Sequence, residues 1–170
     1  MQETGEGAGS GCSVNVPLPP GTGDDLFVHA FRSVVPPLVE RFKPDVIVSQ
    51  LGVDTFWSDP LAHLSITTNG FCTMVAMIRD LAPKWVALGG GGYDSTNVAR
   101  AWTLAWAIMN DVEAPEEIPG SFLLQQGGAG FPGRKLRDGP LAVDKGKRGE
   151  LEKAVERTLA AVRERLRVRS

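Results

Sequence analysis

The sequence predicts an α/β fold built on a parallel sheet, and three observations lead to this class. Two short apolar runs, at 46–51 and 85–88, contain the β-branched or aromatic residues that are typical of buried strands. Each run is followed by helical spacing of apolar residues, at 69–81 and 97–110. Strands that alternate with helices in this way favour parallel strands joined by helical crossovers.

The remaining elements follow from local signals along the chain. A short strand is expected at 13–16, ended by Pro17, and a helix is expected to begin near Asp25 with Asp24 as its cap. Pro36 and Pro37 should break or kink that helix. The run at 46–51 is apolar enough to predict a strand that is covered on both faces.

The C-terminal region reads as an extended segment followed by an amphipathic helix. Residues 113–147 are rich in Pro and Gly. Apolar residues then recur at three- and four-residue spacing from Leu151 to Leu166, which predicts a helix docked on the body of the protein.

Composition places the chain among ordinary globular proteins. It has 170 residues, of which 42% are hydrophobic and 22% charged, so it can bury a sizeable core. No apolar run approaches about eighteen residues, so no membrane span is expected. The N-terminus has no signal-peptide pattern, which gives a cytoplasmic location as the expectation. Cys12 and Cys72 belong to no metal-binding pattern and are expected to be plain thiols.

Charge is unevenly distributed along the chain, although the net charge is only -2. Basic residues predominate after residue 134, and a basic tail can bind nucleic acid. Acidic residues interrupt this tail, so we instead expect it to pack on the acidic remainder of the same chain. Nucleic acid is therefore not expected as a partner.

Polar residues that could carry chemistry follow both central strands. Asp54 stands just after the first strand, and four glycines and Tyr93 follow the second. Ligands bind outside the carboxyl ends of strands in open α/β sheets, so both loops are candidates for one site. By itself, Asp54 could bind a metal, act as a base or cap the next segment.

Other chemistries are less well supported by the residues. A glycine-rich loop before a helix can cradle phosphate, but neither GxxxxGK[ST] nor GxGxxG is present. His63 could act as a base, whereas His29 fits a surface or packing position within a helix. No GxSxG is present, so a serine hydrolase is not supported.

Several stretches, in order along nearly the whole chain, are very similar to bacterial acetoin-utilisation-type deacetylases of the histone deacetylase superfamily. They are VNVPLPPGTGD at 14–24, SQLGVD at 49–54, DPLAHL at 59–64, LGGGGY at 88–93 and NVARAWT at 97–103. The resemblance implies a three-layer α/β/α fold with a parallel sheet, of which this chain is the C-terminal portion. It also implies a zinc-dependent amidohydrolase that removes acetyl or other acyl groups from amines such as acetyl-lysine.

The resemblance assigns roles to individual residues. Asp54 matches one of three zinc ligands, and Tyr93 matches the tyrosine that donates a hydrogen bond to the developing oxyanion. Pro60 and Leu61 match residues that line the substrate channel, and Gly91 and Gly92 let the substrate pass close to the backbone. The other ligands, an Asp-x-His pair, and the paired active-site histidines stand upstream in the family.

Three expectations follow for the isolated chain. Residues 1–112 form the C-terminal part of the catalytic domain, residues 113–147 an extended segment, and residues 148–170 a C-terminal helix of the same domain. The chain needs the N-terminal half of the domain as a partner and is inactive without it.

Phe56 replaces a histidine found in many bacterial relatives, which leaves substrate choice open but not the metal role of Asp54. A non-catalytic module with the same fold half and, more weakly, a nucleotide-binding domain remain as alternatives.

Overall fold

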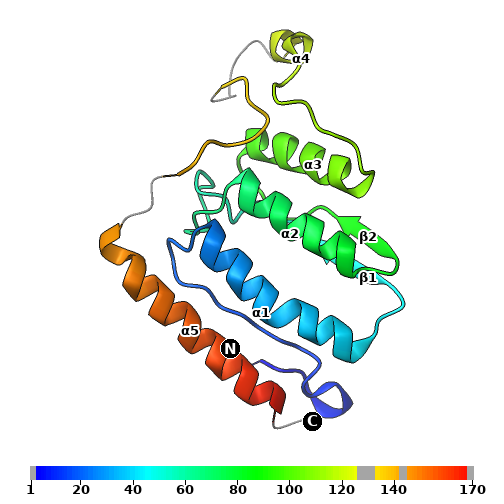
Figure 1. Cartoon of the computed structure of the whole chain (residues 1–170), viewed down its shortest axis with the longest axis vertical. Helices are drawn as coiled ribbons and strands as arrows, with labels where there is room; N and C mark the ends of the chain where they lie inside the picture. The colour runs from blue at the N-terminus through cyan, green and yellow to red at the C-terminus, as the bar shows by residue number, and fades with distance from the viewer. Residues whose placement is uncertain (1–2, 126–132, 142–144, 168–170) are drawn as a thin grey trace.

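The computed structural model describes residues 3–125, 133–141 and 145–167. Within these residues, four long helices lie side by side in the order α5, α1, α2, α3 (Figure 1). A short helix, α4, stands apart from them, and a single 3₁₀ turn lies near the N-terminus. The helix bounds are α1 Asp24–Phe42, α2 Thr68–Leu81, α3 Ser95–Met109, α4 Gly120–Gln125 and α5 Lys145–Arg167, and the 3₁₀ turn is Gly7–Gly9.

The two central strands pair in parallel, as the alternation of strands and helices predicts. They are β1 Ile47–Gln50 and β2 Trp85–Leu88, with Val48 opposite Val86 in the register. Helix α2 makes the crossover between them, so both strands end at the same edge of the sheet. This edge is where the glycine-rich loop and the loop of Asp54 begin.

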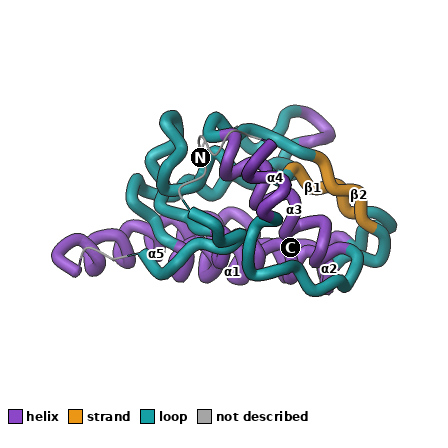
Figure 2. Tube along the Cα trace, turned by 90° about the horizontal axis from the view of Figure 1, so that it is seen from above, coloured by secondary structure: helices purple, strands orange, loops and turns teal. Residues whose placement is uncertain are grey.

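Only one face of this sheet is covered by the described residues, which corrects the expectation of cover on both faces. Ile47, Trp85 and Ala87 pack against the main hydrophobic core. On the other face Val48 is 62% exposed and Val86 is 48% exposed. Figure 2 shows the strands at one side of the helices, so β1 and β2 have an apolar face that no described helix covers.

Two hydrophobic clusters hold the helices together. The main one joins α2, α3 and the loop after β1, and its fully buried members include Phe56, Val75 and Leu104. The second joins α5 to α1 through Val155 and Leu159, which are both completely buried. The amphipathic pattern of the C-terminal region thus has the predicted result, a helix docked on the body.

The N-terminal region differs from the sequence-based predictions in two ways: α1 is not broken at its prolines, and no strand forms at 13–16. Helix α1 continues through Pro36 and Pro37 to Phe42. These prolines leave the carbonyl groups of Arg32 and Ser33 without their helix donors; Arg32 is exposed and Ser33 is half-buried, so neither residue is sealed from water. Residues 13–16 form no strand, because this segment pairs with no other strand and packs its valines on the cluster between α1 and α5.

Several helix ends also differ from their predicted positions. Gly23 is the N-cap of α1, and the carboxylate of Asp24 instead accepts hydrogen bonds from the backbone and hydroxyl of Thr67. Helix α3 begins two residues earlier than predicted because Asp94 caps it. Helix α5 begins at Lys145, and α4 lies inside the segment at 113–147 that was expected to be extended throughout.

The basic residues of α5 contact the acidic part of the same chain. The basic helix α5 pairs with the acidic body through Arg148 and Asp25 at 2.6 Å, which agrees with a tail that packs on its own chain. Cys12 is exposed and Cys72 is buried, and both are free thiols. Burial raises the pKa of the Cys72 thiol above its ordinary value. No helix in the described ranges combines the length and apolar composition needed to cross a bilayer.

Candidate functional site

The loops after β1 and β2 lie against each other, which the sequence alone could not show. The amide of Leu51 donates to the carbonyl of Leu88 at 2.8 Å, and the amide of Val53 donates to the carbonyl of Gly91 at 2.7 Å. These two bonds continue the parallel pairing beyond the end of the sheet. They place Asp54 directly beside the glycine-rich loop.

The carboxylate of Asp54 faces Gly91 and a cavity of about 300 Å³. Any side chain at Gly91 would collide with the carboxylate oxygen, so glycine is required for this approach. No described residue donates a hydrogen bond to the Asp54 side chain. The cavity walls thus present a carboxylate whose oxygens remain available to a ligand.

Gly92 and Tyr93 complete the glycine-rich loop. Gly92 has φ of 152°, and a Cβ there would stand 2.5 Å from the side chain of Val53, so the loop excludes larger residues at this position. The Tyr93 residue is 59% exposed. Its phenol thus stays accessible at the end of the loop while its backbone is tightly constrained.

The side chain of Asp59 links the two loops through hydrogen bonds. It is only 7% exposed, and its two carboxylate oxygens accept hydrogen bonds from the amides of Tyr93 at 2.8 Å and Leu61 at 2.9 Å. Leu61 itself is 62% exposed, and Pro60 is also exposed. The predicted channel residues and Tyr93 are therefore fixed by one carboxylate.

A second set of hydrogen bonds joins the same loops on the other side of Tyr93. Asp94 accepts from the backbone and hydroxyl of Thr96 and from the hydroxyl of Ser58. Burial raises the pKa of the Asp94 carboxyl, but the bonds from Thr96 and Ser58 outweigh it, so the pKa lies below its ordinary value. Asp94 is thus an ionised cap that fixes the start of α3.

Neither histidine lines the cavity beside Asp54. The ring of His29 stands 2.7 Å from Glu156 and ties α1 to α5. His63 is exposed, and its backbone carbonyl accepts from the amide of Gly21. The two histidines thus contribute nothing to the cavity beside Asp54.

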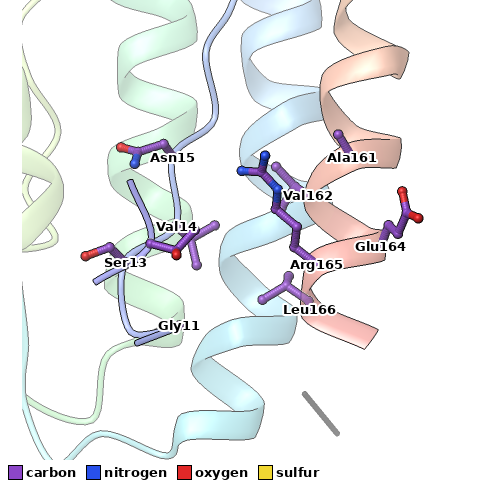
Figure 3. Close-up of a pocket in the computed structure, with 10 residues that line it drawn as sticks. Gly11, Ser13, Val14, Asn15, Ala161, Val162, Glu164, Arg165 and Leu166 are labelled. Atoms are coloured by element: carbon purple, nitrogen blue, oxygen red, sulfur yellow. The ribbon is translucent and has the colours of Figure 1, made fainter. Parts of the chain in front are cut away.

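A larger cavity, of about 580 Å³, lies elsewhere, between the N-terminal segment and α5. Figure 3 shows Val14 and Asn15 on one side and Ala161 and Leu166 of α5 on the other. None of the predicted site residues lines it. Its walls hold no arrangement of acid, base and nucleophile, so it adds no chemistry to the candidate site.

Three residues that the sequence analysis did not single out tie α3 to neighbouring segments of the chain. Trp102 of α3 donates from its ring nitrogen to the carbonyl of Leu51 at 2.9 Å. Arg100 pairs with Asp138 at 2.7 Å, and both side chains are nearly buried. An arginine on the buried face of a helix indicates that an acidic partner is needed. The partner of Arg100 is 38 residues away, so residue spacing alone does not identify it.

Within the part of the chain that the structure describes, Asp54 has no further metal ligands beside it. Among the described residues, no three His, Cys, Asp or Glu side chains come together as a metal-binding group. Zinc in a catalytic site normally has three protein ligands. The available carboxylate fits the role of one ligand, and a complete set requires groups from outside the described residues.

Comparison with known proteins gives consistent relatives. The chain is 40% identical over 131 residues to the acetoin utilization protein AcuC of Bacillus subtilis (strain 168), covering 74% of this chain and 34% of that protein. It is 34% identical over 119 residues to human histone deacetylase 1, covering 70% of this chain and 25% of the human protein. The chain thus spans about a third of the length of the first relative and a quarter of the second.

Solved structures confirm the arginase/deacetylase-like α/β fold. An HDAC homologue complexed with SAHA matches 92% of this chain and 44% of its own, with a TM-score of 0.74 and 30% identity. An HDAC homologue from Aquifex aeolicus gives a TM-score of 0.72 at 29% identity, with the same coverage. A sequence profile described as the histone deacetylase domain matches residues 1–109, well over half of the sequence. The chain therefore belongs to the histone deacetylase family and contains part of its domain.

Proposed function

We propose that this chain is the C-terminal part of a zinc-dependent deacetylase domain that hydrolyses acyl amides such as acetyl-lysine. One observation carries the proposal: the bond from Val53 to Gly91 places the available carboxylate of Asp54 beside the loop that ends in Tyr93. A metal ligand and an accessible hydroxyl donor are the two components that amide hydrolysis would need from this half of the domain. The relatives named deacetylases support the same reaction class.

Asp54 is the zinc ligand that this chain contributes. Gly91 keeps the carboxylate accessible, and the cavity beside it leaves room for the ion. Zinc held there would act as a Lewis acid and would polarise the acyl carbonyl. The two remaining ligands and the histidines that handle the proton come from the N-terminal half of the domain.

Tyr93 is the oxyanion donor, and the loops on either side of it define the substrate path. Its phenol is exposed while its backbone amide is held by Asp59, so the hydroxyl can reach a bound substrate from a fixed origin. Pro60 and Leu61 form an exposed channel wall on the same side. The backbone at Gly91 and Gly92 lets an extended acyl-amine chain pass close by.

The uncovered face of the sheet is the surface for the rest of the domain. Val48, Val86 and Leu88 are each about half or more exposed on this face. Such a face is normally covered in a parallel sheet. Residues 1–112 then form the C-terminal part of the catalytic domain, and the C-terminal helix packs on it as a further part of the same domain.

The nucleotide-binding alternative is disfavoured by the charge at the start of α3. A phosphate would bind at the helix N-terminus after the glycine-rich loop. The carboxylate of Asp94 already accepts the amide of Thr96 there, and a second negative charge would be repelled. A non-catalytic module remains the rival, and it differs from the proposal in what Tyr93 does.

The test is Tyr93→Phe in the chain completed by an N-terminal half that supplies the missing histidines and ligands. Removing one oxyanion donor should lower kcat by about 10²–10³ and change KM little. The melting temperature should hardly move, because the ring is retained and the phenol is exposed. Turnover close to that of the unsubstituted enzyme would contradict the role of Tyr93.

Zinc content provides a second test. The isolated chain should retain well under one zinc per molecule after dialysis, whereas the completed domain should hold one and lose it with Asp54→Ala. Asp45→Asn, an exposed carboxylate before β1, is the matched control and should keep the metal. Stoichiometric zinc in the isolated chain that is lost with Asp54→Ala would show a different ligand set.

A further inference from the structure

The buried carboxylate of Asp59 has no cation near it in the described part of the chain. Its oxygens bond only to the backbone amides of Tyr93 and Leu61. A buried carboxylate is unfavourable unless its oxygens accept hydrogen bonds, and bonds to an ionised acceptor are shorter and stronger than neutral ones. The two amides and the carboxylate therefore fix one another's positions.

We propose that Asp59 is a positioning residue that sets where the hydroxyl of Tyr93 stands relative to Asp54. The inference rests on the proposed function, because it assigns Asp59 a purpose in the same reaction. Asp59 lies five residues after Asp54 in the loop following β1, and Tyr93 lies in the loop following β2. The single bond from Tyr93 to Asp59 thus connects the oxyanion donor to the segment that carries the metal ligand.

The bond to Asp59 fixes the backbone position from which the side chain of Tyr93 extends. The residue is 59% exposed, and no described residue accepts a hydrogen bond from its hydroxyl. Its position therefore derives from its backbone, which Asp59 holds on one side and the Asp94 cap holds on the other. A displacement of about 1 Å at a reacting group can cost on the order of 10²-fold in rate.

Asp59 also couples the donor to the channel wall. Its second oxygen holds the amide of Leu61, two residues further along the same loop. A shift of this carboxylate would move the channel wall and the oxyanion donor together. The substrate would then meet both groups in a fixed mutual arrangement.

Asp59→Asn is the discriminating variant because it keeps the shape of the side chain. An asparagine has one acceptor oxygen, and its amide group cannot accept from a backbone amide. The bond to Leu61 is local and should persist, while the long-range bond to Tyr93 is lost. In the completed domain we expect kcat to fall about 10–100-fold, with KM within about twofold, because the donor is misplaced while the channel wall stays.

Hydrogen exchange in the isolated 170-residue chain gives a readout that does not depend on activity. In the unsubstituted chain the Tyr93 amide should be protected, and Asp59→Asn should speed its exchange by about tenfold or more, as loss of a hydrogen bond of about 1.4 kcal/mol would do. The amide of Leu104, in the middle of α3, should be unaffected. Asp45→Asn, which also removes one carboxylate, should leave exchange and turnover unchanged.

Each result bears on one claim. A Tyr93 amide that exchanges like a free peptide in the unsubstituted chain overturns the inference without any variant. Equal acceleration at Tyr93 and Leu104 would mean that Asp59 only stabilises the fold, and an unchanged kcat in Asp59→Asn would mean that its bond does not serve the reaction. An inactive but zinc-loaded unsubstituted domain would instead overturn the proposed function and the inference that rests on it.

Discussion

Asp138 lies outside the helices and strands. Among substitutions in such segments that remove a side chain of similar size, Asp138→Ala should destabilise the chain most. Asp138 lies in the described segment at 133–141 and reaches into the core. Its oxygens accept from the guanidinium of Arg100 at 2.7 Å and from the backbone amide of Thr68 at 2.8 Å. The side chains of Arg100 and Asp138 are only 6% and 11% exposed, so water cannot replace the lost partner.

The magnitude follows from the charge that would be left behind. Without Asp138, Arg100 keeps only its bond to Asn97 at 2.9 Å, and its Nε already has no partner. Breaking a buried ion pair by removing one partner costs about 3–5 kcal/mol. At about 2–4 °C per kcal/mol for a chain of this size, Asp138→Ala should lower Tm by about 6–20 °C.

A double-substitution cycle separates the ion pair from general damage. Urea unfolding followed by tryptophan fluorescence should show that Arg100→Met combined with Asp138→Ala loses less than the sum of the single changes, because no buried charge remains. Asp111→Asn, whose side chain is 99% exposed, should change the free energy of unfolding by less than about 0.5 kcal/mol. A loss below about 1 kcal/mol in Asp138→Ala, or strict additivity in the cycle, would refute the reasoning.

Three further outcomes are expected. Leu159→Ala should cost about 2–5 kcal/mol in urea unfolding because Leu159 is fully buried between α5 and α1, whereas Leu124→Ala, at a residue 83% exposed, should cost little. The lowered pKa of Asp94 contributes stability that is complete above its ordinary value of 3.8 and is lost as pH falls through the folded value. Asp94→Asn should therefore have a lower free energy of unfolding than the unsubstituted chain near pH 7. Acid titration should show the two free energies converging at low pH. The isolated chain should self-associate through its uncovered sheet face, and sedimentation should show less association for Val86→Lys than for Val112→Lys; a compact monomer in the unsubstituted chain would argue against this.

The strands and the helices at 69–81 and 97–110 were predictable because their signals are local. Apolar runs and helical spacing indicate where a segment buries its side chains, and parallel pairing of β1 and β2 agrees with their alternation. Pro36 and Pro37 show the limit of local rules. Packing of α1 against α5 and α2 outweighs two missing hydrogen bonds on an exposed side of the helix, which no window around the prolines reveals.

The candidate site was predictable in its residues but not in its connections. Asp54 and Tyr93 stand after strands, and their loops meet because those strands are neighbours in the sheet. Strand order is not encoded in either strand by itself. The hydrogen bond between Asp59 and Tyr93 could not be predicted for the same reason, because it joins residues 34 positions apart.

The bonds that place the backbones of Asp54 and Tyr93 all lie within the described part of this chain. Val53 pairs with Gly91, Asp59 holds Tyr93, and both partners of each bond belong to the two loops after β1 and β2. The relative position of the two loop backbones that carry Asp54 and Tyr93 is therefore set by contacts within this chain. Under the proposed function, the N-terminal half would add the remaining ligands and proton-handling groups to these loops, and the uncovered face of the sheet would give it an apolar surface on which to dock. The backbones of Asp54 and Tyr93 should consequently keep their relative position whether or not metal is bound.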